Sequence, residues 1–327
     1  MKIAVTGASG HIGVNLCRLL VNKGIQVRAL IHENRLGIDD LELETVSGDL
    51  LDLPSLKTLV DGVDIVFHLA AVISIQGKKD KEILSLNVEG TRNLLKAASE
   101  ASVKRFIHFS SIHALSQEPY AKVLDETRPI AINDWMVYSR SKALAEKEVL
   151  RFCDSGLDAV ILNPTAVIGP FDYRPSLLGR ALILMASGRL PFIVPGGYNW
   201  VDVRDVAQAA FSSIKNARRG ERYLLSGHWS DLKALSRIVS NCSGRKPPWI
   251  SCPRWLAKIG LPFIQSYCFF NRTEPLYTYD SINTLKRAHQ NISHQKAAQE
   301  LGFTPRPLEE SLKDTLEWFR ENGYLTG

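Results

Sequence analysis

A glycine-rich octapeptide lies between the first apolar run of the chain and its first helical pattern. Met1–Val5 is short and apolar, which is typical of a buried strand, and Ile12–Asn22 carries apolar residues at helical spacing. Between them, TGASGHIG (6–13) has a glycine at every third position, Gly7, Gly10 and Gly13. A strand, a glycine turn and a helix form the unit with which parallel sheets bind phosphates. An ordinary turn is the alternative, and the flanking strand and helix favour the phosphate site.

Strand-like and helical segments continue to alternate through the first half of the chain. The predicted strands are Gln26–Ile31, Asp64–Val72, Val103–Ser110 and Leu157–Ile168, and the predicted helices are Glu82–Ala98 and Tyr138–Phe152. Runs such as DIVFHLAAV and AVILN are almost wholly apolar, as expected of strands that are covered on both faces. The alternation predicts an α/β fold with a doubly wound parallel sheet, the Rossmann fold.

After Pro170 the sequence becomes rich in proline and glycine, and we expect a smaller, irregular C-terminal substrate lobe. A helix at Val201–Lys215 and a strand at Arg222–Ser226 are expected to return to the sheet. The predicted dinucleotide-binding domain is residues 1–170 plus about 200–227, and the predicted substrate lobe with its C-terminal helix is 171–199 and 228–327. Arg245–Asn271 is rich in Pro, Trp and Phe and is expected to cap the substrate.

Composition excludes several classes of protein. The chain has 327 residues and a formal net charge of +6, but its Lys and Arg residues form no block, so no nucleic-acid partner is expected. Its five cysteines lie far apart without a CxxC spacing, and His108 and His113 have no ligand partners nearby, so neither disulfides nor a metal site is predicted. The start has no signal-peptide pattern and no run of about 18 apolar residues occurs, so we expect a cytoplasmic protein without a transmembrane segment.

The end of the second predicted strand bears on the choice of cofactor. In NAD sites a carboxylate at this place accepts hydrogen bonds from the ribose 2′-hydroxyl. Here Ile31 holds the expected position and His32 and Arg35 follow it, although Glu33 is near. We therefore predict NADP as the preferred cofactor, with NAD as the alternative. The competing interpretation is that His32 and Arg35 are solvated loop residues.

A tyrosine and a lysine four residues apart open the predicted helix Tyr138–Phe152. Tyr138 and Lys142 share one helix face, and an ammonium beside a phenol lowers the pKa of the phenol from about 10. Such a tyrosine can exchange a proton with a substrate oxygen. Ser111 follows the preceding strand toward the same crevice and is a second candidate hydrogen-bond donor. Surface neighbours and strand-end capping are the alternative interpretations.

Several motifs occur together in one order along nearly the whole chain. They are TGASGHIG (6–13), GDL (48–50), HLAA (68–71), NVEGT (87–91), FSS (109–111), YSRSK (138–142), NPTAVIGP (163–170) and WVDVRDVA (200–207). In this combination the chain resembles the extended short-chain dehydrogenase/reductase superfamily, the NAD-dependent epimerase/dehydratase family, and within it the dihydroflavonol-4-reductase-like group. The resemblance implies a Rossmann fold and a homodimer built from the helices Glu82–Ala98 and Tyr138–Phe152.

The resemblance also implies roles for individual residues. Tyr138 is the expected general acid/base, Lys142 binds the nicotinamide ribose and tunes Tyr138, and Ser111 orients the reacting oxygen. The cofactor-binding candidates are Gly7, Ser9, Gly10, His11, Ile12, His32, Arg35, Asp49, Leu50, Leu69, Ala70, Ala71, Asn87, Tyr138, Lys142, Pro164 and Val167. Among these, Asp49 and Leu50 would contact the adenine, and Asn87 would support Lys142. His113 and Asn163 are the candidate substrate contacts.

Three functional hypotheses follow. The first is an NAD(P)-dependent oxidoreductase that reduces a ketone or aldehyde to an alcohol, with Tyr138 as general acid/base. The second is a nucleotide-sugar epimerase or dehydratase with tightly bound NAD, which the departure from Val-Tyr-Gly to Ile112–Leu115 weakens. The third, a protein that only binds the dinucleotide, is disfavoured because Ser111, Tyr138 and Lys142 are all present. The apolar stretch Pro253–Phe270 hints at a hydrophobic substrate or at contact with a membrane surface, although interior packing is commoner.

Overall fold

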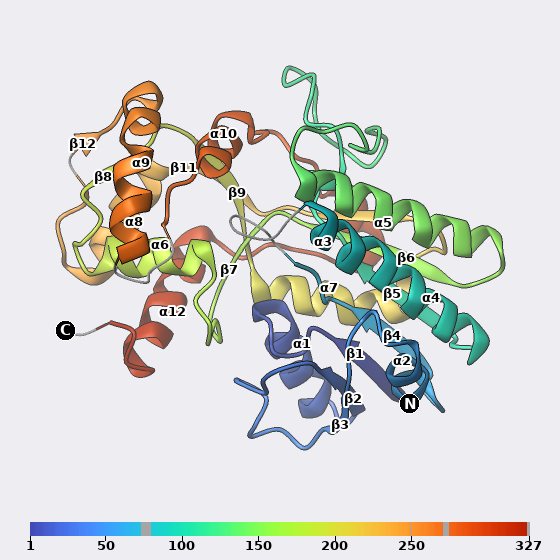
Figure 1. Cartoon of the computed structure of the whole chain (residues 1–327). Coiled ribbons are helices and arrows are strands. Elements are labelled where there is room, and N and C mark those ends of the chain that lie inside the picture. The colour runs from blue at the N-terminus through green and yellow to red at the C-terminus, as the bar shows by residue number, and fades with distance from the viewer. Residues whose placement is uncertain (73–79, 249, 271–274, 326–327) are drawn as a thin grey trace.

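A seven-stranded, fully parallel sheet forms the centre of the computed structural model, which describes residues 1–72, 80–248, 250–270 and 275–325 (Figure 1). The strands are β1 (Lys2–Thr6), β2 (Gln26–Ile31), β3 (Glu44–Ser47), β4 (Ile65–His68), β5 (Arg105–Phe109), β6 (Ala159–Pro164) and β10 (Arg222–Leu225). Their order in the sheet is β10-β6-β5-β4-β1-β2-β3, and every neighbouring pair is parallel. The predicted doubly wound Rossmann fold is confirmed.

Helices cover both faces of this sheet. On one face α1 (His11–Asn22) packs beside α7 (Val203–Asn216). On the other face α2 (Leu53–Val60), α4 (Gly90–Glu100) and α5 (Val137–Asp154) lie in sequence. Because all seven strands are parallel, their carboxyl ends meet at one edge, where a parallel sheet binds its ligands.

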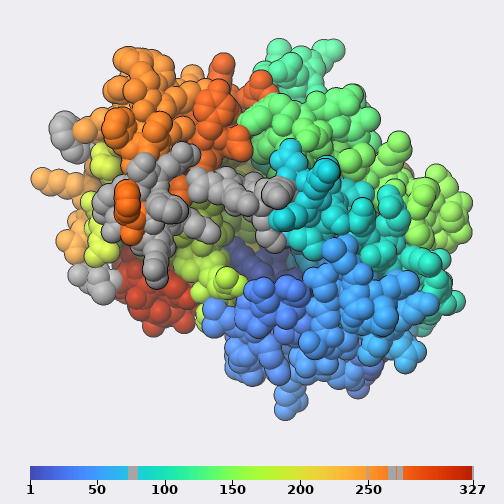
Figure 2. All heavy atoms as spheres, viewed as in Figure 1, coloured from blue at the N-terminus to red at the C-terminus, as the bar shows by residue number. Residues whose placement is uncertain are grey.

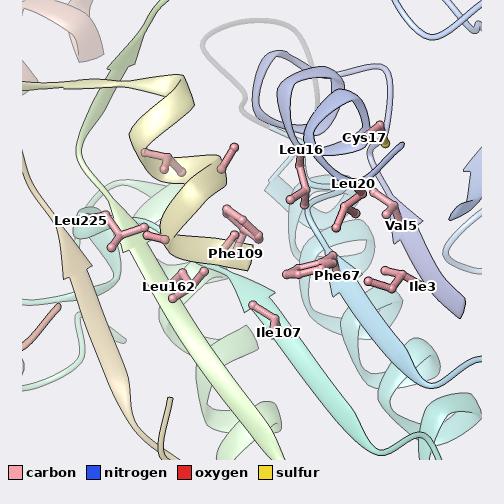
Figure 3. Close-up of a cluster of buried hydrophobic side chains, with 14 of the residues drawn as sticks. Ile3, Val5, Leu16, Cys17, Leu20, Phe67, Ile107, Phe109, Leu162 and Leu225 are labelled. Atoms are coloured by element: carbon pink, nitrogen blue, oxygen red, sulfur yellow. The ribbon is translucent and has the colours of Figure 1, made fainter. Parts of the chain in front are cut away.

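Successive residues of β1 point to opposite faces of the sheet and are buried on both. Ile3 and Val5 pack against Leu16 and Leu20 of α1, as Figure 3 shows. Ala4, between them, belongs to the cluster formed with α2 and α4. A strand covered in this way has no polar face, which explains why its sequence is an unbroken apolar run.

The remaining elements form a smaller lobe beside the carboxyl edge (Figure 1). One three-stranded sheet has the order β11-β9-β7, with β7 (Ala166–Ile168), β9 (Gly197–Asp202) and β11 (His228–Asp231), and β8 (Phe192–Ile193) pairs with β12 (Ile250–Ser251). The helices of the lobe are α6 (Leu177–Ala186), α8 (Leu232–Ser243), α9 (Arg254–Phe270), α10 (Tyr279–Arg287) and α12 (Leu308–Glu321), whereas α11 (Gln295–Leu301) packs on α7 and β10 of the large sheet. A second hydrophobic core, including Leu182, Leu235 and Phe319, joins α6, α8 and α12.

Some predicted elements have different limits in the structure. The single strand expected at Leu157–Ile168 is two strands in different sheets, because β6 ends at Pro164 and β7 then pairs with β9. The strand expected at Asp64–Val72 ends at His68. The helix expected at Val201–Lys215 begins at Val203, since Val201 belongs to β9 and Asp202 caps the helix by accepting a hydrogen bond from the Arg204 amide at 2.8 Å.

The helix expected at Glu82–Ala98 is also interrupted. It consists of α3 (Asp80–Leu84), a π-helical turn at Ser85–Glu89 and α4. Wide turns of this kind are rare and often occur at functional sites. Asn87, one of the predicted site residues, lies inside this turn.

A buried ion pair ties α5 to the edge strand β10. The carboxylate of Glu146 is fully buried and accepts hydrogen bonds from Arg222 Nε and from Asn163 Nδ2, each at 2.6 Å. A buried charge is tolerated only when it is paired and hydrogen-bonded, and both oxygens of Glu146 meet this condition.

We expect Arg222→Met to lower the free energy of unfolding by about 3–5 kcal/mol, because it leaves the Glu146 carboxylate buried without its counter-charge. Arg218→Met is the matched control, since Arg218 pairs with Glu300 but its side chain is 62% exposed; this change should cost about 0–1 kcal/mol. Urea unfolding of the two variants measures both values. Equal losses would show that Arg222 contributes no more than a surface ion pair.

Candidate functional site

The glycine turn at the end of β1 requires glycine for different reasons at each position. Gly7 has a φ of +72°, and a Cβ atom there would lie 2.7 Å from the amide nitrogen of Ala70. A side chain at Gly13 would collide with the carbonyl of Gly7. At Gly10, by contrast, the nearest neighbour of a Cβ would be the Gly7 oxygen at 3.3 Å. The first and third glycines therefore pack the loop, and the second leaves the backbone open to a ligand.

The start of α1 fits a pyrophosphate. Ser9 and Gly10 lie in the turn, and His11 and Ile12 begin the helix, whose first amides have no partner within a helix and carry partial positive charge. The His11 ring reaches away to the carbonyls of Gly169 and Pro170, both at 3.1 Å. The ring of His11 thus links the turn to the segment after β7.

The residues predicted to hold the adenosine end meet beyond β2 and β3. His32 Nε2 lies 3.4 Å from Asp49 Oδ2, and the His32 side chain is 62% exposed. Arg35 is 45% exposed and lies 3.9 Å from Asp39. Leu50 is buried, and its carbonyl accepts a hydrogen bond from Asn93. Arg35 and His32 therefore border an open surface at this end of the site.

Tyr138, Lys142 and Ser111 come together where β5 ends against α5. Lys142 is buried, and its ammonium donates a hydrogen bond to the carbonyl of Phe109, the last residue of β5, at 2.9 Å. Ser111 follows two residues later, and its side chain interacts with the Tyr138 hydroxyl. Ser111 Oγ also accepts a hydrogen bond from the His113 amide at 3.2 Å. Because the oxygen accepts from this amide, the hydroxyl proton of Ser111 can be donated to another oxygen.

The expected lowering of the phenol pKa is wrong for this structure. Burial raises the pKa of Tyr138, and the hydrogen bond with Ser111 opposes that shift only in part. Burial also lowers the pKa of Lys142 to about 8, against the opposing effect of the Glu146 carboxylate. Without a nucleotide, desolvation of the phenolate dominates, and the Lys142 ammonium is directed to the Phe109 carbonyl. Tyr138 is therefore a protonated acid at neutral pH.

A chain of buried hydrogen bonds begins at the glycine turn. The Ala70 amide donates to Thr6 Oγ1 at 3.2 Å, and Thr6 Oγ1 lies 2.7 Å from His68 Nδ1. His68 Nε2 lies 2.9 Å from Thr91 Oγ1, which donates to the Asn87 carbonyl at 2.6 Å. Since Thr91 uses its proton on Asn87, His68 carries its own proton on Nε2. Burial lowers the pKa of His68 to about 3, so the ring is neutral.

Asn87 extends this chain to the helix that carries Tyr138. Its Nδ2 donates to the Val72 carbonyl at 3.0 Å and to Ser141 Oγ at 2.9 Å, and its Oδ1 accepts from the Val72 amide at 2.8 Å. Ser141 in turn donates to the Tyr138 carbonyl at 2.8 Å. Sequence analysis identified Asn87 but missed Thr6, His68 and Thr91, although HLAA and NVEGT are motifs that contain the latter two.

The other predicted site residues lie along the same edge of the sheet. Leu69, Ala70 and Ala71 directly follow β4, Pro164 ends β6 and Val167 lies in β7. Asn163 is fully buried, and its side-chain amide donates to the Ser111 carbonyl at 2.9 Å and to Glu146. In this structure Asn163 holds the backbone at Ser111 and faces the interior of the protein.

His113 connects the site to a neighbouring cavity. Its ring meets the Tyr138 ring edge-on, with centroids 6.3 Å apart. Burial lowers its pKa, and the nearby Asp134 opposes this shift. The cavity has a volume of about 330 Å³, and its wall includes His113, Ile130, Trp135, Met136, Thr284 and Arg287. Apolar surface with a few polar groups is typical of small-molecule sites.

Figure 2 shows a hollow between the lobe and the sheet domain, with residues from the start of the chain visible at its base. Among the residues that the structure describes, no group of three or more His, Cys, Asp or Glu side chains is arranged to hold a metal ion. The site instead offers backbone amides at the start of α1 for phosphates and a Tyr-Lys-Ser group in which Lys142 and Ser111 are buried and Tyr138 is half-buried. Fold and site together are those of a dinucleotide-binding enzyme of the Rossmann type.

Comparison with known proteins identifies the family. A model of the NAD dependent epimerase/dehydratase family matches residues 3–226, and the chain belongs to this family. It is 34% identical to sterol demethylase protein B of Methylococcus capsulatus, over 99% of this chain and 100% of that one. It is 30% identical to dihydroflavonol 4-reductase of Arabidopsis thaliana, over 72% and 68% of the two chains. The crystal structure of gox2253 superposes with a TM-score of 0.86 at 34% identity, covering 99% of both chains.

The depressed pKa of Lys142 predicts how nucleotide binding depends on pH. Because burial lowers this pKa to about 8, the ammonium is present below that pH and is lost as the pH rises through it. If the ammonium binds the nucleotide, affinity for NADPH should fall by up to about tenfold per pH unit above this pKa. Lys142→Met should bind more weakly and lose this dependence.

Titration calorimetry on both sides of that pKa measures the effect. Lys147→Met is the control, because Lys147 lies on the same helix and is exposed. A wild-type affinity that does not change across the range, or the same slope in Lys142→Met, would exclude Lys142 from the nucleotide site.

Proposed function

We propose that this protein reduces a ketone or aldehyde to an alcohol, with NADPH as the hydride donor. The observation that carries the proposal is the half-buried Tyr138 at the start of α5, whose raised pKa keeps the phenol protonated and whose hydroxyl interacts with the Ser111 side chain just beyond the end of β5. β5 is separated from β1 and its glycine turn by β4 alone, so a dinucleotide on the turn extends toward Tyr138. The family is NAD-dependent, and its member from Arabidopsis named above is a reductase.

Tyr138, Ser111 and Lys142 have different roles in the proposed reduction of the carbonyl group. When bound, the nicotinamide supplies a hydride to the carbonyl carbon. Tyr138 gives its phenolic proton to the carbonyl oxygen, so the substrate gains one hydride and one proton. Ser111 donates a second hydrogen bond to that oxygen as negative charge develops. After this transfer Tyr138 is a phenolate, which the Lys142 ammonium stabilises. A proton from water then restores the neutral phenol.

The cavity beside His113 is the proposed place for the substrate. Trp135, Met136 and Ile130 supply apolar wall, and Arg287 is the one Lys or Arg among the residues of the wall. Ser139, which directly follows Tyr138, also contributes to the wall. A carbonyl compound with an apolar body therefore fits this space, with its reactive oxygen directed to Tyr138.

We expect Tyr138→Phe to lower kcat for carbonyl reduction by about 10²–10⁴-fold, because it removes the proton donor and little else. Tyr279→Phe is the matched control, since Tyr279 is 56% exposed and lies outside the residues that form the cavity wall. This control should retain most of the activity. The measurement is the loss of NADPH absorbance against a panel of ketones and aldehydes, with thermal unfolding to verify the fold of each variant.

Mass spectrometry together with the NADPH assay distinguishes the reductase from the nucleotide-sugar epimerase or dehydratase. A nucleotide-sugar epimerase regenerates its NAD and retains it through purification, whereas a reductase exchanges its cofactor after each turnover. Mass spectrometry of the denatured protein detects a retained nucleotide. Stoichiometric NAD together with a flat NADPH trace for every carbonyl would contradict the proposal.

Preference for NADP is part of the proposal and rests on Arg35 and His32 at the end of β2. Arg35→Ala should raise the KM for NADPH by about 10-fold or more, since a charge-assisted hydrogen bond to the 2′-phosphate contributes about 1.5–3 kcal/mol. The KM for NADH should stay within about twofold, because NADH lacks that phosphate. Steady-state kinetics with both cofactors provide this internal control. An equal rise for NADPH and NADH would overturn the assignment of Arg35.

A further inference from the structure

Helix α9 exposes a continuous row of large apolar side chains. We call this the α9 face: Trp255 is 66% exposed, Leu256 47%, Ile259 61% and Phe263 77%. Ala257 and Leu261, on the opposite side of the helix, are buried in the core of the lobe. The helix therefore already uses one apolar face for packing, and it presents a second one outward.

The spacing makes the α9 face a single surface. Trp255, Ile259 and Phe263 are four residues apart and follow one another along one side of the helix. Exposed apolar residues are normal when they are scattered, whereas a contiguous patch with large aromatics marks an interaction site. In Figure 1 α9 lies in the lobe, far from the strands β2 and β3 of the large sheet.

The charge of the surrounding sequence identifies the chemistry of the partner. Residues 232–270 contain six Lys and Arg residues and no Asp or Glu, which equals the formal net charge of +6 of the whole chain. The six are Lys233, Arg237, Arg245, Lys246, Arg254 and Lys258. Arg245 and Lys246, which precede α9, are exposed.

We propose that the α9 face docks on an anionic lipid membrane, with α9 lying in the plane of the surface. Aromatic and aliphatic side chains would enter the boundary between headgroups and acyl chains, and the cations would pair with the headgroups. Each Lys or Arg near such a surface strengthens the attraction to the anionic headgroups. A second copy of the chain fits less well, because a symmetric contact through this face would bring the two basic segments together.

Helix α10 connects α9 to the cavity beside His113. Lys258 of α9 donates to Asn283 Oδ1 of α10 at 2.8 Å, and its ammonium lies 4.5 Å from the centre of the Tyr279 ring. The next residues along α10, Thr284 and Arg287, form part of the cavity wall. Docking through α9 would hold this wall near the lipid. Vesicle binding is measured without turnover, so it tests the docking independently of the proposed reductase activity.

Co-sedimentation with vesicles tests the proposal on the full chain. Wild type should bind vesicles of phosphatidylcholine mixed with phosphatidylglycerol, and bind those of phosphatidylcholine alone more weakly. The double variant Trp255→Ser with Phe263→Ser should lose at least about tenfold in affinity, since it removes two of the large apolar side chains that would enter the lipid. The control is Leu51→Ser with Val123→Ser, at residues 44% and 45% exposed outside the lobe, which should bind as wild type.

A second variant tests the charge without altering the α9 face. Arg245→Glu with Lys246→Glu should weaken binding to the anionic vesicles by about tenfold or more and leave binding to the neutral ones unchanged. The proposal is overturned if wild type stays in the supernatant, if it binds both vesicle types equally, or if both double-serine variants lose the same affinity. If the wild type binds no vesicles, and light scattering shows that it is a dimer which Trp255→Ser with Phe263→Ser dissociates into monomers, the α9 face would instead be a contact with a second copy.

Discussion

The close approach of Gly7 to Ala70 is the contact on which the rest of the site depends. A left-handed glycine lets the chain turn directly off β1 while the backbone after β4 passes against it. That contact leaves the amides of α1 open to a phosphate, and it also brings Thr6 under the Ala70 amide. From Thr6 the buried hydrogen bonds run through His68 and Thr91 to Asn87. The phosphate end and the reactive end of the site are thus parts of one hydrogen-bonded edge.

Burial determines the protonation states at the reactive end. The same desolvation that raises the pKa of Tyr138 lowers the pKa of Lys142 to about 8, so at neutral pH Tyr138 is a neutral phenol while Lys142 is still an ammonium. A neutral phenol is the form that donates a proton, which suits reduction. Glu146 opposes the shift of Lys142 and also holds Asn163, whose amide supports the backbone at Ser111. The ion pair of Glu146 with Arg222 therefore connects the stability of the fold to the electrostatics of the site.

Local patterns predicted the large sheet and its helices, because strands such as β1 and helices such as α5 have periodic or unbroken apolar sequences that depend on burial alone. The short edge strand β3 was missed because its sequence, ETVS, has no such pattern. The break between β6 and β7 depends on a partner strand more than 30 residues later, β9, which local sequence does not reveal. The spacing of Tyr138 and Lys142 and the place of Ser111 after a predicted strand selected these three residues, and the structure brings them together. The sequence did not predict the direction of the Tyr138 pKa shift, because that direction depends on how many side chains surround the phenol.

The structure of the protein with NADP bound tests the central claim most directly. The account predicts the pyrophosphate on the turn at Gly10 and the nicotinamide beside Tyr138. A carbonyl carbon about 3–3.5 Å from nicotinamide C4 would then place its oxygen within hydrogen-bonding distance of the phenol. A nicotinamide C4 more than about 10 Å from the Tyr138 hydroxyl, with the pyrophosphate still on the glycine turn, would contradict the account.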